Sequence, residues 1–196
     1  YTDQKIVMMG YAKRTIVSTL AVLAICITAL VFIIKAINDL VSNINPNNAN
    51  KILLLLVGEN ADSIIREIPI KTINMGRVST DTLITLYNVS SVFLSSSIDD
   101  AGPSMINQSM ACGTPVISFN TGTSLDVLHN GISGFKATPF SQTEFSKCLR
   151  KMYELSDVEY EKLRTTTRIT ALQYNSLENY PKALQEIFDE YYKKNV

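Results

Sequence analysis

Residues 91–119 read SVFLSSSIDDAGPSMINQSMACGTPVISF. The apolar runs over 91–97 and 115–119 predict two strands, and the segment 104–112 between them predicts a helix. Gly113 follows that helix directly and a proline comes two residues later, which is a typical helix stop. A strand, a helix and a second strand in this order form a βαβ unit, in which the two strands are parallel. This stretch therefore predicts a parallel sheet with a helix packed on one face.

The same alternation extends over most of the chain. Further strands are predicted at four places, which are 5–9, 51–58, 72–76 and 134–137. Helices are predicted between them, at 35–44, 61–67, 80–90 and 123–129. We therefore expect an α/β fold, a Rossmann-like doubly wound parallel sheet, with 1–196 as a single domain.

After residue 140 the sequence predicts helices only. Three helix starts in the chain carry a pattern in which a hydroxyl residue and an acid three positions later cap the first turn. They are Ser141 with Glu144, Ser156 with Glu159, and Thr123 with Asp126. The amphipathic segment at the chain end, 176–196, is expected to be a closing helix.

Composition excludes several classes of function. The chain has 196 residues, of which 46% are hydrophobic, so a normal buried core can form. The 18 lysines and arginines balance the 18 aspartates and glutamates, which gives no electrostatic case for a nucleic-acid partner. Three cysteines without paired spacing predict neither a disulfide framework nor a zinc ribbon. One histidine, His129, cannot build a His-rich metal site, and we expect it to end a helix as a dipole partner.

The run from Thr15 to Ile34, TIVSTLAVLAICITALVFII, has no charged residue and lies between Arg14 and Lys35. As a helix it would be about 30 Å long, the thickness of the hydrocarbon core of a bilayer. Three interpretations stay open: a membrane span, a buried element such as a strand followed by a core helix, or a segment replaced through a reading-frame error. A membrane span would separate the first predicted strand from the later ones, which favours the other two interpretations.

The candidate binding site follows from the parallel sheet, because such sheets bind ligands at the carboxyl ends of their strands. Four strand ends qualify, which are those after 5–9, after Gly58, near Gly76 and Arg77, and after Ser97. We expect these ends to lie along one edge of the sheet.

The helix that starts near Ser104 is the strongest part of this candidate site. The amides of Ser104, Met105 and Ile106 would be unpaired there and, with the positive end of the helix dipole, would suit a phosphate or diphosphate. Asp100 just before the helix and Gln108 one turn beyond Ser104 could bind sugar or ribose hydroxyls. The alternative is a plain strand-to-helix turn, with Asp100 as an N-terminal charge partner and Gln108 as a solvated residue.

Residues 99–135, DDAGPSMINQSMACGTPVISFNTGTSLDVLHNGISGF, resemble the signature of the retaining family-4 glycosyltransferases, which have the GT-B fold. The segment MACGTPV, 110–116, is similar to the family's helix end, and NGISGF, 130–135, is similar to a later turn. The resemblance covers roughly residues 51–196 and implies the C-terminal, donor-binding half of such an enzyme. The implied activity is transfer of a sugar from a nucleotide-diphosphate sugar, with retention and without a metal or cofactor.

The resemblance also implies roles for individual residues. Asp100 corresponds to the acid that contacts the hydroxyls of the donor sugar, and Gln108 to the acid that holds the ribose. The amides at the helix start would bind the diphosphate, and the backbone near Arg77 would face the base. The implied donor-binding residues are Gly58, Arg77, Val78, Asp100, Gly102, Ser104, Met105, Ile106 and Gln108, and the implied catalytic residues are Asp100 and Arg14.

Three features depart from the family pattern. Asp100 and Gln108 stand where the family carries two glutamates. Lys13 or Arg14 could supply one charge of the family's basic pair, whereas the Lys-Gly stretch is missing where the apolar run lies. The chain starts at Tyr1 without an initiator methionine, and we expect the N-terminal GT-B domain to be missing. These departures predict a fragment that is inactive as an isolated chain.

The expected partners follow from the family: a nucleotide sugar, a glycan or lipid-linked acceptor, and the missing N-terminal domain. We expect a cytoplasmic hexosyltransferase of envelope or polysaccharide synthesis, with peripheral membrane association left open. Two other classes of function also stay open, a non-catalytic nucleotide-sugar-binding module and an accessory protein anchored by 15–34. A nucleotide-sugar epimerase of the same fold is a nearer alternative.

Overall fold

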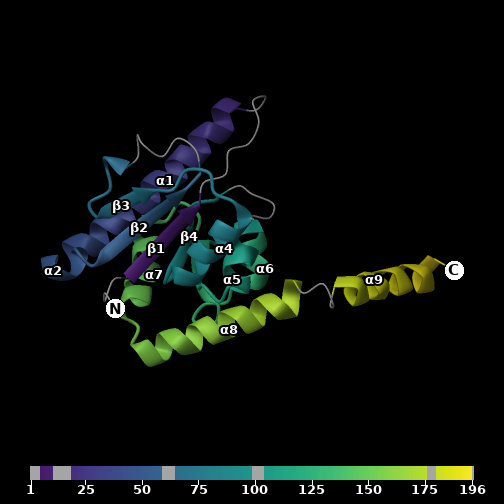
Figure 1. Ribbon diagram of the computed structural model, residues 1–196. Helices are drawn as coiled ribbons and strands as arrows, with labels where there is room; N and C mark the ends of the chain where they lie inside the picture. The colour runs from purple at the N-terminus through teal and green to yellow at the C-terminus, as the bar shows by residue number, and fades with distance from the viewer. Residues whose placement is uncertain (1–4, 11–18, 59–64, 99–103, 176–179, 196) are drawn as a thin grey trace.

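Figure 1 shows the computed structural model of the chain, which describes residues 5–10, 19–58, 65–98, 104–175 and 180–195. For residues 5–10, 19–30, 175, 180, 183 and 195 it describes the backbone only. Most of the helix predicted over 61–67 lies outside the described residues, as do Arg14, Asp100 and Gly102.

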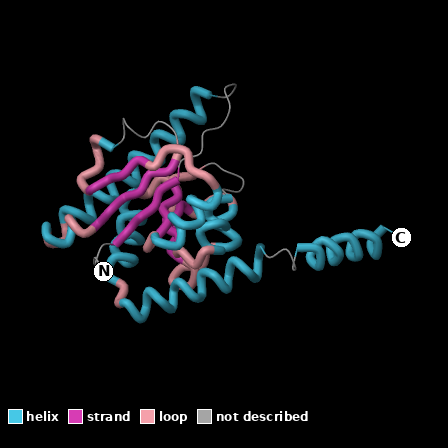
Figure 2. The backbone as a smooth tube through the Cα atoms, viewed as in Figure 1, coloured by secondary structure: helices cyan, strands magenta, loops and turns pink. Residues whose placement is uncertain are grey.

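Six parallel strands form the sheet at the centre of the molecule (Figure 2). They are β1 (Lys5–Gly10), β2 (Ile52–Val57), β3 (Lys71–Asn74), β4 (Val92–Ser95), β5 (Val116–Phe119) and β6 (Gly134–Ala137). Their order in the sheet is β3-β2-β1-β4-β5-β6, and each pair is parallel. The predicted doubly wound parallel sheet is therefore confirmed, with each of the six strands in its predicted place.

Helices cover both faces of this sheet (Figures 1 and 2). They are α1 (Thr19–Ser42), α2 (Pro46–Ala49), α4 (Thr80–Val89), α5 (Ser104–Ala111), α6 (Thr123–Val127), α7 (Gln142–Glu154), α8 (Asp157–Asn175) and α9 (Tyr180–Asn195). Figure 1 shows α9 beyond the end of α8, away from the sheet. The amphipathic helix predicted at the chain end does form as α9, and its role as a closing helix stays a prediction.

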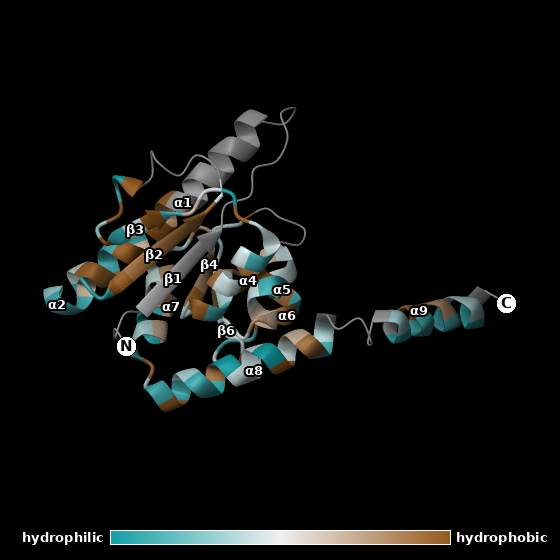
Figure 3. Ribbon diagram, in the orientation of Figure 1, coloured by the Kyte–Doolittle hydropathy of each residue, from teal (hydrophilic) through white to brown (hydrophobic). Residues whose placement is uncertain are grey.

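The strands β2, β4 and β5 are buried on both faces, whereas the edge strand β3 is largely exposed. In β2, Leu54 and Leu56 belong to a first core cluster, whereas Leu53 and Leu55 belong to a second one on the opposite face. This alternation is the period of two that a strand imposes on its side chains. Figure 3 shows β2 as a continuous hydrophobic ribbon between helices that carry hydrophilic outer surfaces. A continuous apolar run is what a strand covered on both faces requires.

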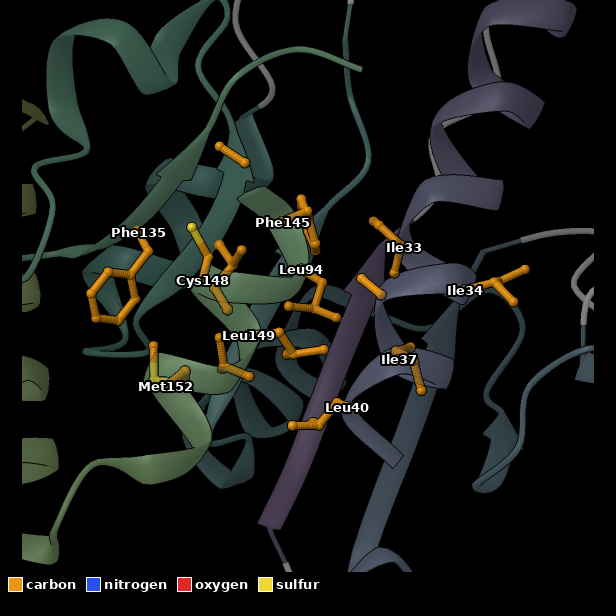
Figure 4. Packing of buried hydrophobic residues seen from close by; sticks show 14 of the residues in the cluster. Ile33, Ile34, Ile37, Leu40, Leu94, Phe135, Phe145, Cys148, Leu149 and Met152 are labelled. Atoms are coloured by element: carbon orange, nitrogen blue, oxygen red, sulfur yellow. The ribbon is translucent and has the colours of Figure 1, made fainter. Parts of the chain in front are cut away.

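Helix α1 contains the apolar run from Thr19 onward. Ile33 and Ile34 are buried, and with Ile37 and Leu40 they form one wall of the first core cluster. Figure 4 shows these side chains across from α7, with Leu94 of β4 between them. The expected strand in this run is wrong from Thr19 onward, because the backbone there is helical.

Within the described part of the chain, no helix is long and apolar enough to cross a membrane. The side chains of residues 19–30, which make up most of the apolar run, are outside that description.

Two of the three predicted helix caps form. The Ser156 Oγ accepts a hydrogen bond from the amide of Glu159, and the Glu159 carboxylate accepts from the amide and hydroxyl of Ser156. These bonds hold the pKa of Glu159 below its usual value. Ser141 caps α7, although the Glu144 carboxylate accepts from the Thr138 amide instead. The third cap is wrong, because α6 has Gly122 at its N-cap and makes no side-chain capping bond there.

The start of β6 provides a test of the sheet packing. Gly134 pairs with Val116 of β5 at a φ of 146°, and a Cβ there would lie 1.9 Å from the Val116 carbonyl oxygen. We expect Gly134→Ala to lower the free energy of unfolding by more than about 3 kcal/mol, because two backbones would have to separate. Denaturant unfolding measures the loss.

Gly131→Ala is the matched control for this substitution. Gly131 also has a positive φ, 75°, but a Cβ there would meet nothing within 4 Å. It should cost only about 1–2 kcal/mol, the conformational cost of the left-handed region. Equal losses for the two variants would contradict the close approach of β5 and β6.

Candidate functional site

The carboxyl ends of four strands meet at one edge of the sheet. Gly10 at the end of β1 lies opposite Val57 of β2 on one side and Ser95 of β4 on the other, and Asn74 of β3 pairs with Leu56. The strand order runs outward from β1 in both directions, so β1 and β4 form the point at which the winding reverses. Ligands of doubly wound sheets bind at the carboxyl edge at this point. The four strand ends chosen from the sequence therefore do lie together.

Two glycine turns line the outer part of this edge. The Gly58 amide donates to the Gly76 carbonyl at 2.9 Å, so the turns after β2 and β3 stay paired beyond the strands. Gly58 has a φ of 128° and Gly76 a φ of 59°, which side-chain-bearing residues rarely adopt. The Asn74 side chain accepts from the Gly76 amide and holds the second turn. A ligand can approach this backbone closely, because no Cβ stands in front of it.

The segment predicted to face a base follows the second turn. Arg77 is exposed, and Val78 is half-buried against the second core cluster. The predicted role of this backbone toward a base stays a prediction. Ser79 then caps α4 by accepting from the Thr82 amide.

The N-terminus of α5 lies after β4 at the same edge. Ser104 is exposed, Met105 is half-buried and Ile106 is 1% exposed. The burial of Ile106 and Met110 orients the helix on the sheet, while its first-turn amides have no partner within the helix. Such an end attracts anions. Of the residues predicted here, Ser104, Met105, Ile106 and Gln108 are described.

Helix α8 holds the other end of α5. Arg168 donates to the Ala111 carbonyl at 2.5 Å, and Arg164 donates to the Gly113 carbonyl at 3.4 Å. Gly113 has a φ of 74°, as expected for the residue that ends a helix. Two cations at the C-terminal end of α5 interact favourably with the helix dipole. Neither arginine was predicted from the sequence, since no local pattern shows which carbonyls it reaches.

A buried polar network joins α4, α5 and the turn before β5. Thr114, which is fully buried, donates its hydroxyl to the Tyr87 carbonyl at 2.6 Å. The Thr114 carbonyl in turn accepts from the hydroxyl of Ser109, also fully buried. These hydroxyls explain the polar residues of the SMACGTP segment, because each one satisfies a buried carbonyl. The network fixes α4 relative to α5.

The side chain of Gln108 contacts the same network. The Tyr87 hydroxyl lies 3.5 Å from the Gln108 Oε1, and the Tyr87 ring meets Phe93 edge-on at 5.7 Å. Burial raises the pKa of Tyr87 well above its usual value, with a smaller effect from nearby Cys112, so the phenol stays protonated. Gln108 itself is exposed. Tyr87 was not predicted as a site residue, because a tyrosine in a predicted helix is usually a packing residue.

Other chemically active side chains lie elsewhere. His129 follows the end of α6, as predicted, near the start of β6 and away from the carboxyl edge, with its ring 6.1 Å from that of Tyr174. Among the residues that the structure describes, no three His, Cys, Asp or Glu side chains gather in a group that could hold a metal ion.

The parallel order, the glycine turns and the α5 N-terminus at one edge are typical of the class of α/β domains that bind nucleotides. Residues 29–170 match the family described as Glycosyl transferases group 1, and the chain belongs to this family. No curated protein matches the chain at a significant level.

Solved glycosyltransferases of the GT-B type share the fold. A glycosyltransferase from Rickettsia africae is 19% identical, with a TM-score of 0.71 over 97% of this chain and 48% of that one. Sucrose-phosphate synthase from Thermosynechococcus elongatus is 14% identical, with a TM-score of 0.71 over 99% and 47%. Anabaena HepE in complex with UDP and glucose is 14% identical, with a TM-score of 0.66 over 96% and 49%. The chain thus spans about half the length of each of these proteins.

The buried network predicts the effect of one substitution. Thr114→Val keeps the volume of the side chain but removes the hydroxyl that the Tyr87 carbonyl accepts from. We expect the free energy of unfolding to fall by about 1 kcal/mol, the usual net value of a buried hydrogen bond. Urea unfolding measures it.

Thr165→Val serves as the control, because the exposed Thr165 hydroxyl only bonds back within α8. Its effect should stay within about 0.5 kcal/mol. A Thr114→Val variant as stable as the Thr165→Val variant would contradict the structural role of the network.

Proposed function

We propose that this chain is the donor-binding half of a glycosyltransferase that moves a sugar from a nucleotide-diphosphate sugar to an acceptor hydroxyl. The proposal includes retention at the anomeric carbon and catalysis without a metal or cofactor. The observation that carries it is the α5 N-terminus, which follows β4 at the switch point of the sheet, on the edge that also carries two glycine turns, in a chain of this family. A helix end of this kind suits the diphosphate that leaves during transfer.

In this proposal, each described element of the site binds a different part of the donor. The turns at Gly58 and Gly76 let the nucleotide approach the backbone, and the segment at Arg77 and Val78 faces the base. The first amides of α5, at Ser104, Met105 and Ile106, bind the diphosphate, and the side chain of Gln108 binds the ribose. Asp100 would contact the hydroxyls of the donor sugar, Gly102 would lie against the donor, and Arg14 would offset the charge of the leaving group.

The chemistry of the transfer needs little more than this positioning. The bond between the anomeric carbon and the diphosphate oxygen breaks as the acceptor oxygen bonds to that carbon, and the acceptor proton leaves with the diphosphate. Amide dipoles in a fixed arrangement stabilise the charge that develops on the leaving oxygen.

The rest of the enzyme would lie in a second half. The chain spans about half of its structural relatives, and the Anabaena relative is solved with UDP and glucose. We therefore propose that an N-terminal GT-B domain supplies the site for a glycan or lipid-linked acceptor. The proposed enzyme is a hexosyltransferase of envelope or polysaccharide synthesis that works in the cytoplasm, with peripheral contact to the membrane.

One observation favours a second candidate function, binding without transfer. Gln108 is neutral, whereas the family to which the motif is similar carries a glutamate at this position. A neutral hydrogen bond to ribose is weaker than a charge-assisted one by about a factor of two in energy. A non-catalytic nucleotide-sugar-binding module would keep affinity but lose turnover.

Binding is tested first with nucleoside diphosphates. We expect UDP, GDP or ADP at 100 times its dissociation constant to stabilise the purified full-length protein by about 2.7 kcal/mol, seen as a rise in Tm. Gln108→Ala should raise the dissociation constant of that nucleotide about three- to tenfold, because one hydrogen bond is lost. Gln185→Ala on the exposed face of α9 should leave the affinity unchanged. If none of the three nucleotides shifts the Tm, the proposed site is wrong.

Turnover separates the two candidate functions. We expect the full-length protein to release nucleoside diphosphate from the matching nucleotide sugar in the presence of an acceptor, with the configuration of the new glycoside read by NMR. Product formed with retained anomeric configuration in the presence of EDTA, which removes metal ions, supports the proposal in full. Tight binding without any release in a screen of glycan and lipid-linked acceptors would instead support the binding module.

A further inference from the structure

A buried tyrosine on α4 contacts the candidate ribose-binding residue on α5. The Tyr87 hydroxyl oxygen and the Gln108 Oε1 are 3.5 Å apart, at the long end of the hydrogen-bond range. Tyr87 is 1% exposed, whereas Gln108 is exposed. Gln108 lies four residues beyond Ser104, on the same face of α5 and one turn from the helix start. The contact therefore joins the interior of the domain to the face that the donor would meet.

The tyrosine is held firmly in place. Its ring packs edge-on against Phe93 of β4, with centroids 5.7 Å apart. Its carbonyl accepts from the Thr114 hydroxyl at 2.6 Å, and Thr114 is tied to Ser109 of α5. The Tyr87 hydroxyl thus has a fixed position relative to the helix that carries Gln108.

The chemistry of the two groups sets the direction of the contact. A protonated phenol must donate its proton, and a buried proton without an acceptor costs about 1–3 kcal/mol. A carboxamide has an accepting end and a donating end. With Oε1 toward Tyr87 the phenol proton has its acceptor, whereas a flipped amide would set N–H groups against it. The hydroxyl therefore favours the orientation in which the Gln108 Nε2 points away from Tyr87.

We propose that Tyr87 is a positioning residue that makes Gln108 a hydrogen-bond donor toward the ribose of the nucleotide. A carboxylate at position 108 could only accept from a ribose hydroxyl, so this protein would contact the ribose with the opposite polarity. The polarity explains how glutamine replaces an acid here without loss of the site: the ribose oxygen accepts from Nε2 while Tyr87 occupies Oε1. This inference rests on the proposed function and names the residue that tunes its nucleotide site.

A double-mutant cycle tests the positioning role. The dissociation constant of the stabilising nucleoside diphosphate is measured for the full-length wild type, Tyr87→Phe, Gln108→Ala and the double variant. We expect each single change to weaken binding about three- to tenfold, and the double variant to bind like Gln108→Ala alone. Tyr160→Phe is the matched control, because Tyr160 also donates from a partly buried site, to the Ser91 carbonyl, but not to Gln108. It should leave the affinity unchanged.

A second measurement tests the polarity and does not depend on the Tyr87 variant. The wild type and Gln108→Glu are compared on nucleoside diphosphates whose 2′- or 3′-hydroxyl is replaced by hydrogen or by fluorine, which accepts weakly but cannot donate. The informative ribose position is the one at which replacement of the hydroxyl by hydrogen weakens binding. There the wild type should bind the fluoro analogue about two- to threefold more tightly than the deoxy analogue, because Nε2 can donate to fluorine, and Gln108→Glu should lose that preference.

The outcomes separate this inference from the proposed function. If Tyr87→Phe weakens binding equally with and without Gln108, Tyr87 acts through the fold and the positioning role is wrong. If wild type and Gln108→Glu rank the analogues alike, the polarity is wrong. Both results leave nucleotide binding standing. If no nucleoside diphosphate binds the wild type at all, the proposed function fails, and this inference fails with it.

Discussion

The burial of a parallel sheet on both faces is the constraint on which the rest of this structure depends. Parallel strands need crossover connections, and helices that pack on the two faces remove the inner strands β2, β4 and β5 from water. β2 shows the consequence, since Leu53 and Leu55 enter one core cluster while Leu54 and Leu56 enter the other. Each helix that covers the sheet needs an apolar stripe facing it, and the Ile33–Leu40 stretch of α1 supplies one of them.

The candidate site follows from the same constraint. Since the strands are parallel, their carboxyl ends align at one edge, and α5 starts there and runs back along the sheet. Ile106 and Met110 bury the inner face of this helix, and arginines of α8 donate to the carbonyl of Ala111 at its end and to that of Gly113 just beyond it. A helix fixed in this way keeps its first amides at the edge without any contact from a ligand. Preorganised dipoles of this kind are what stabilisation of a leaving diphosphate requires.

Elements with a strong local pattern could be predicted, and elements that depend on distant contacts could not. The strands β1, β2, β4 and β5 are apolar runs, and Ser156 with Glu159 forms the reciprocal cap that its spacing indicates. The cap expected at Thr123 fails, because Gly122, which has no side chain, is the N-cap of α6 at a φ of 51°. The apolar run before Lys35 was ambiguous, since a uniformly apolar segment has no periodicity that separates strand from helix. Of the site residues, the glycines and the α5 start could be predicted, whereas Tyr87 reads as any core aromatic.

The sequence by itself determined the class of fold, the edge of the sheet that could bind a ligand and the similarity to a glycosyltransferase domain. Those conclusions rest on local order along the chain: apolar period, turn residues and the MACGTPV segment. Only the tertiary structure decided which residues hold α5 and what the Gln108 amide contacts. The contact partners Arg164 and Gly113 are 51 positions apart, and Tyr87 and Gln108 are 21 apart. Hydrogen bonds between such distant residues arise from the way the helices pack on the sheet, and no pattern along the chain encodes them.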